Sequence, residues 1–167
     1  KRNLPEISSN KYQEQANKIV KYLTDISNKF WDDTNKQSDD ITKDMDNIDK
    51  DMNLGVTYIM DTSVKKDNYV SFKLQLSGAL GGVSWDNEEG YNFNILTGEV
   101  LNFSDITNNY NNLVNVTFNE MVKYISSQEY ASNLENNWQE ILKNEIYKIG
   151  NWYFVDEGIK FCIDKYS

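Results

Sequence analysis

The helical and strand-forming patterns of this chain occur in separate blocks, and this order restricts the fold more than any other feature. Between residues 16 and 30, apolar side chains recur every three or four positions, which predicts an amphipathic helix. Runs rich in β-branched and aromatic residues, which predict strands, follow at 55–60, 69–76 and 91–95. Two further helical patterns begin near Thr107 and Ser132. Because helices and strands are segregated, we expect one α+β domain over 1–167, with helices packed on a mainly antiparallel sheet.

Turn residues mark where several of these elements end. Lys65-Lys66-Asp67-Asn68 predicts one hairpin turn, and Asp156-Glu157-Gly158 predicts a second in a closing hairpin. The glycines at 78, 81 and 82 predict a break after the second strand, so we expect residues 78–90 to form a loop. The acidic stretch after Phe30 keeps apolar side chains at helical spacing, so residues 10–52 form either one helix or two.

The charge of the chain is strongly negative. Its 17 basic and 26 acidic residues give a formal net charge of −9 and a pI near 4.5. Such a field repels phosphate backbones and anionic lipid headgroups, which argues against nucleic acid and membrane surfaces as partners. It accelerates encounter with a cationic partner. Solubility alone is the simpler explanation of the same charge.

The chain has no histidine and a single cysteine, Cys162. These counts exclude a disulfide within the chain, catalytic triads that use histidine, and zinc sites built from several cysteines or histidines. Cys162 lies in an apolar stretch and is predicted to be a small packed residue. A calcium loop starting at Asp49 fails because Leu54 and Met60 replace the required glycine and glutamate. We therefore expect no enzyme activity, no cofactor and no metal.

Aromatic and acidic residues gather on the predicted loop and provide the candidate binding site. Tryptophan is enriched at interface hot spots, so Trp85 and its neighbours Asp86, Asn87 and Glu88 are ligand-binding candidates. One alternative is that Trp85 is a core residue at the start of a strand. A second is a glycosidase-like pair among Asp86, Glu88 and Glu89, which would need a fixed separation that sequence does not reveal.

Three segments in this order resemble a known family. They read LPEI with QANKI (4–7 and 15–19), YNFNILTGEVLNFSDI (91–106) and WYFVDEGIKF (152–161). The chain resembles the extracytoplasmic domain of RsiV-type anti-sigma factors, which also occurs in the non-catalytic part of some bacterial peptidoglycan deacetylases. It departs from the family pattern in lacking a histidine in the glycine-rich loop and in stopping at Ser167.

The resemblance implies a sensor of cell-envelope stress outside the membrane of a Gram-positive bacterium. Such a domain recognises lysozyme, a cationic protein, and its binding leads to release of a sigma factor after proteolysis. Loop 78–90 and the closing hairpin would supply the contacts, and Tyr166 joins the ligand-binding candidates. Because the sequence begins at Lys1 rather than Met, we interpret it as a processed or trimmed fragment, and the resemblance implies a membrane anchor upstream of it. The alternative is an accessory module that binds peptidoglycan beside a separate deacetylase or hydrolase.

Overall fold

The computed structural model describes residues 2–4, 6–44, 55–66, 68–80 and 83–162. The strands are β1 (Arg2–Asn3), β2 (Gly55–Lys66), β3 (Tyr69–Leu80), β4 (Val83–Asn94), β5 (Trp152–Val155) and β6 (Gly158–Phe161). The helices are α1 (Gln13–Asp44), α2 (Tyr110–Ser126) and α3 (Trp138–Glu145), with short 3-10 turns η1 (Phe103–Ile106) and η2 (Glu129–Asn133). The predicted α+β fold, with helices packed on a mainly antiparallel sheet, is confirmed.

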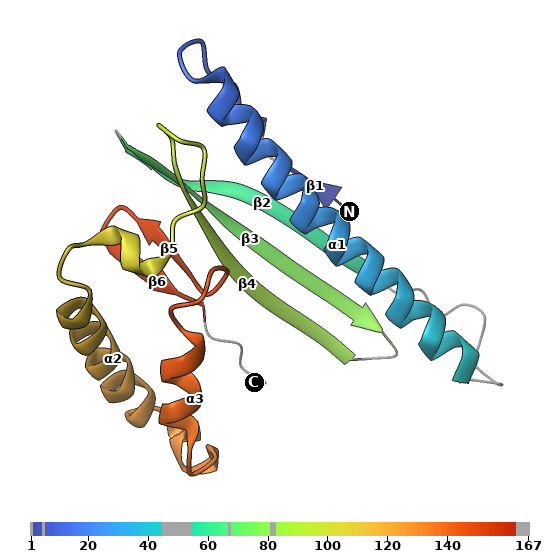
Figure 1. Cartoon of the computed structure of the whole chain (residues 1–167). Coiled ribbons are helices and arrows are strands. Elements are labelled where there is room, and N and C mark those ends of the chain that lie inside the picture. The colour runs from blue at the N-terminus through green and yellow to red at the C-terminus, as the bar shows by residue number, and fades with distance from the viewer. Residues whose placement is uncertain (1, 5, 45–54, 67, 81–82, 163–167) are drawn as a thin grey trace.

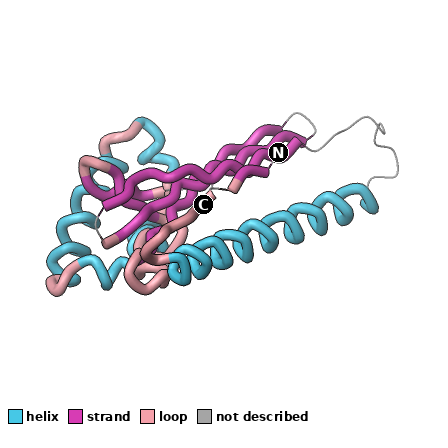
Figure 2. Tube along the Cα trace, turned by 90° about the horizontal axis from the view of Figure 1, so that it is seen from above, coloured by secondary structure: helices cyan, strands magenta, loops and turns pink. Residues whose placement is uncertain are grey.

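Two sheets of unequal size organise the fold. The larger has the order β1-β2-β3-β4, in which β2, β3 and β4 are antiparallel neighbours and the two-residue β1 runs parallel to β2. The smaller sheet is the hairpin of β5 and β6 that the sequence predicted. Helix α1 runs along one face of the larger sheet (Figure 1). The view from above shows α2 and α3 gathered at one end of that sheet (Figure 2).

The face of the large sheet that packs against α1, here called the helix face, carries the main core. Alternation along the strands directs Tyr58, Met60, Leu74 and Phe93 to this face, where all four are almost fully buried. They meet the apolar stripe of α1, represented by Leu23, in one cluster. Helix α1 is continuous from Gln13 to Asp44, so the acidic stretch extends the first helix at least to Asp44. Residues 45–52 lie outside the described part of the chain.

The opposite face, here called the hairpin face, is covered at one end by β5 and β6. A register shift between Thr62 and Val64 marks a β-bulge, which places Val64 opposite Ser71 on this face. Val64 packs in a second cluster with Phe103, Trp152 and Phe154. A third cluster of Ile125, Leu142 and Ile146 joins α2 to α3. The hairpin face is therefore covered only near β5 and β6.

Two sequence predictions are wrong in position. Residues 78–80 and 83–90, predicted as parts of a loop, are strand: β3 and β4 pair without interruption from Tyr69 opposite Asn94 to Leu80 opposite Val83. The second C-terminal helix begins at Trp138 rather than near Ser132. The reason is that the backbone leaves η2 in an extended conformation at Leu134, with φ −73° and ψ 149°.

Candidate binding surface

The candidates Trp85, Asp86, Asn87 and Glu88 all lie on β4, the edge strand of the large sheet. Because successive side chains of a strand point to opposite faces, Trp85 and Asn87 belong to the helix face and Asp86 and Glu88 to the hairpin face. The four side chains therefore do not converge on one site as a loop would allow. The remaining candidate, Tyr166, lies outside the described residues.

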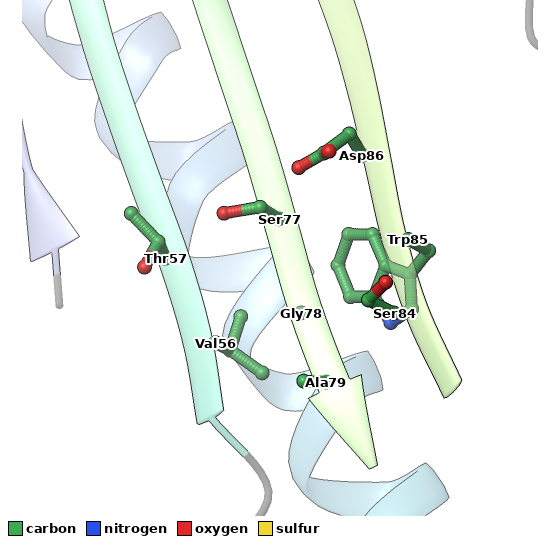
Figure 3. A pocket seen from close by; sticks show the side chains of 8 residues that line it. All are labelled: Val56, Thr57, Ser77, Gly78, Ala79, Ser84, Trp85 and Asp86. Atoms are coloured by element: carbon green, nitrogen blue, oxygen red, sulfur yellow. The ribbon is translucent and has the colours of Figure 1, made fainter. Parts of the chain in front are cut away.

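Trp85 packs across the neighbouring strand near the end of the β3–β4 pair at which Leu80 lies opposite Val83. Its indole ring lies where a side chain at Gly78 would be, since an added Cβ there would stand 2.4 Å from two carbons of the ring (Figure 3). The ring is half-buried and borders a shallow hollow of about 370 Å³. Trp85 is therefore partly a packed residue, as the alternative interpretation held, and partly a surface that a ligand can reach.

Glu88 is engaged by the β5–β6 hairpin. Its Oε1 lies 2.7 Å from the Lys160 Nζ and accepts a hydrogen bond from the Tyr153 hydroxyl at 3.0 Å. The hydrogen bond to Glu88 is the main cause of the raised pKa of Lys160, and burial raises the pKa of Tyr153 to about 12. Both partners therefore keep their usual protonation at neutral pH. Glu88 links β4 to the hairpin, and most of its charge is compensated within the chain.

The thiol of Cys162 lies in the same cluster. Its Sγ is 3.9 Å from the Glu88 Oε1, and the residue is partly buried. Burial, assisted by the negative charge of Glu88, raises the thiol pKa to about 12. The thiol is therefore protonated at neutral pH and a poor nucleophile. This environment agrees with the prediction of a small packed cysteine.

Asp86 differs from Glu88 because its side chain is exposed to solvent. It projects from the part of the hairpin face that β5 and β6 leave uncovered. Asn87 has a local role instead, since its Oδ1 accepts a hydrogen bond of 2.8 Å from the backbone N–H of Glu88. Among the predicted residues, Asp86 and the open side of Trp85 are the groups available to a partner.

Glu89, which the sequence offered only as part of a glycosidase-like pair, is a half-buried carboxylate on the helix face. Glu89 points to the helix face, where its Oε2 accepts a hydrogen bond of 2.6 Å from the Tyr91 hydroxyl. Burial raises the pKa of Glu89, and the hydrogen bond from Tyr91 offsets part of that rise. The ring of Tyr22 on α1 packs edge-on against Tyr91, with centroids 6.3 Å apart. The alternating pattern alone would have placed Glu89 on this face, had residues 83–90 been assigned to a strand.

We expect Glu89→Gln to raise the melting temperature at pH 7 by about 2–4 °C, equivalent to roughly 1 kcal/mol. The pKa of Glu89 is higher in the folded than in the unfolded chain, so its ionised form opposes folding at neutral pH. That cost disappears as the pH falls through the folded-state value toward the unfolded one. The advantage of the variant should therefore vanish near about pH 4. Thermal unfolding from pH 4 to 8 measures it, with the exposed Glu99→Gln as a control that should gain nothing.

Two features are absent from the described part of the chain. No group of three or more cysteine, aspartate or glutamate side chains there is placed to hold a metal ion. No helix in the same part of the chain has the length and apolar character that crossing a bilayer requires.

No protein-family model matches the chain, and no curated protein sequence matches it. Residues 15–19, 91–106 and 152–161 meet in space. A Cβ added to Gly98 would stand 2.8 Å from the backbone oxygen of Gln15, which joins the first segment to the second. The side chain of Asn92 donates a hydrogen bond of 3.0 Å to the backbone oxygen of Trp152, which joins the second to the third.

Proposed function

We propose that this chain is the non-catalytic, extracytoplasmic sensor domain of an anti-sigma factor and that it binds a cationic protein, specifically lysozyme. The observation that carries the binding surface is the exposed Asp86 beside Trp85 on an edge strand, in a chain of net charge −9. Opposite charge favours encounter and orientation of a basic partner. The choice of lysozyme, release of a sigma factor after binding, and an upstream membrane anchor rest on the resemblance to RsiV-type anti-sigma factors.

The positions of the carboxylates favour binding over catalysis. A glycosidase needs two carboxyl groups flanking one bond in a shared cleft. Glu88 is paired with Lys160, and Glu89 lies on the opposite face with its carboxylate bound by Tyr91. Among the described residues of this region, Asp86 therefore has no second free carboxylate with which to form a catalytic pair.

Calorimetric titration with hen lysozyme tests the proposal, at low salt and at about 0.15 M, where screening limits exposed charges to roughly 8 Å. We expect one-to-one binding that survives the higher salt. Binding that disappears with salt would reduce the interaction to general charge attraction. Complete absence of binding would exclude lysozyme as the ligand.

A charge variant sharpens this experiment. We expect Asp86→Ala to weaken lysozyme binding about five- to tenfold, because a basic group facing the edge strand loses its partner. Asp61→Ala is the matched control, since Asp61 is also exposed and the change in net charge is equal, but it lies on β2. Equal losses in both variants would show that only the overall field matters.

A second candidate function is an accessory module that binds peptidoglycan, and the hollow beside Trp85 favours it. The hollow is bordered by Trp85 and by the hydroxyl-bearing residues Thr57, Ser77 and Ser84, which the strand alternation places on the hairpin face (Figure 3). Several hydroxyls on one open sheet surface offer hydrogen bonds to a sugar ring. Co-sedimentation with insoluble peptidoglycan distinguishes this function from protein binding. The wild-type chain should sediment with the peptidoglycan, and Trp85→Ala should reduce the fraction that does.

A further inference from the structure

The outer edge of β4 is used for pairing over only part of its length. Toward the end of the strand, Gly90 N–H donates to the Gly150 oxygen at 2.7 Å, and the Asn92 oxygen accepts from Leu101 N–H at 2.7 Å. Gly90 and Asn92 are even-numbered residues of β4, and alternate residues of a strand direct their backbone groups to the same edge. Because the register with β3 is continuous, the backbone groups of Ser84, Asp86 and Glu88 also point outward.

At the other end of β4 these outward groups are largely open. The N–H of Glu88 is occupied by the side chain of Asn87. Within the described ranges, no segment pairs with the outward N–H and C=O groups of Ser84 and Asp86. An unpaired sheet edge is a template for another extended chain.

We infer that residues 84–88 of β4 form a strand-addition site for an extended basic segment of a protein partner. In this mode, main-chain hydrogen bonds supply affinity and alternating side chains supply specificity. One side of the added strand would face the exposed Asp86 on the hairpin face and suits lysine or arginine. The other side would lie on the helix face beside Trp85, whose ring leans over Gly78 of β3, and suits an apolar side chain. The recognised segment therefore alternates basic and apolar residues.

Charge favours such a segment over a second copy of this chain. Pairing two β4 edges from identical chains would bring acidic strands together, and each chain carries a net charge of −9. Like charges on neighbouring strands destabilise pairing. The inference rests on the proposed function only in taking the partner to be a protein, and it does not require lysozyme.

The test uses a seven-residue peptide of alternating lysine and valine, titrated into the isotopically labelled chain and followed by amide NMR signals. We expect shifts centred on Ser84 and Asp86, together with slower hydrogen exchange of their N–H groups. Two versions of the peptide, N-methylated either at every lysine or at every valine, are the controls. Because alternate residues of a strand direct their N–H groups to the same side, one version should bind about tenfold more weakly and the other should bind like the parent.

Variants of the chain provide the reciprocal test. Ser84→Pro removes an outward N–H that β3 does not use, whereas Ser84→Ala retains it, so only the proline variant should lose the peptide. Equal binding of both methylated peptides, or equal binding by both variants, would overturn strand addition. Lysozyme binding without any peptide binding would overturn this inference alone. Peptide binding without lysozyme binding would retain the edge site and remove lysozyme as the ligand.

Discussion

Replacing Asn92 with leucine is expected to lower the free energy of unfolding by about 3 kcal/mol, because three polar groups lose their partner inside the protein. Asn92 is 2% exposed. Its Oδ1 accepts hydrogen bonds from the Ser71 hydroxyl at 2.6 Å and from the Phe154 N–H at 3.1 Å, and its Nδ2 donates to the Trp152 oxygen at 3.0 Å. Leucine has a similar size, so the loss would report the orphaned groups rather than a cavity. Urea unfolding followed by circular dichroism measures it.

Ser71→Ala is the matched control for this effect. It removes one of the three hydrogen bonds and leaves Asn92 bound to β5, so a loss of about 1 kcal/mol is expected. If Asn92→Leu cost no more than Ser71→Ala, the attachment of β5 to the large sheet would not depend on the asparagine. The combined variant should cost less than the sum of the two single changes, since both remove the same Ser71–Asn92 bond.

Elements with a local pattern could be predicted from the sequence. The apolar stripe that includes Ile19 and Leu23 defines α1, and Asp156-Glu157-Gly158 defines the turn between β5 and β6. The β-rich run at 69–76 identifies β3, although the strand continues to Leu80. In each case, spacing along a short stretch determines which side chains are buried, so the signal is present in the residues themselves.

The first half of β4 could not be predicted in the same way. Ser84 to Glu89 has no alternation of apolar and polar residues, because on this edge strand both faces carry polar side chains. Pairing with β3 through the backbone makes it a strand, and that pairing has no side-chain signature. The link between Glu88 and Tyr153 joins residues 65 positions apart, so only the folded chain brings them together. Trp85, Asp86, Asn87 and Glu88 were therefore assigned to a loop, whereas they alternate between the two faces of a strand.

The close approach of the β4 backbone to β5 makes Gly90 the second position at which a small change should have a large effect. Gly90→Ala is expected to lower the free energy of unfolding by about 2–3 kcal/mol, because there is no room for a methyl group. Its Cβ would stand 2.4 Å from the Trp152 oxygen and 2.6 Å from the Tyr153 Cβ. Relief would require β5 to move away from β4, against the 2.7 Å hydrogen bond from Gly90 N–H to the Gly150 oxygen. Urea unfolding again measures the loss.

Gly78→Ala is the comparison for Gly90→Ala, because its added methyl group would meet a side chain rather than the backbone of a neighbouring strand. There the added Cβ would also meet atoms at 2.4 Å, but they belong to the indole ring of Trp85, which borders an open hollow and can rotate away. We expect a smaller stability loss, of about 1 kcal/mol, with a changed tryptophan emission spectrum. Gly90→Ala should instead disturb β5, which carries Trp152, and weaken the contact of Glu88 with Lys160. Equal stability losses at the two glycines would mean that β5 is free to shift, and that its attachment to β4 is weaker than the Asn92 hydrogen bonds indicate.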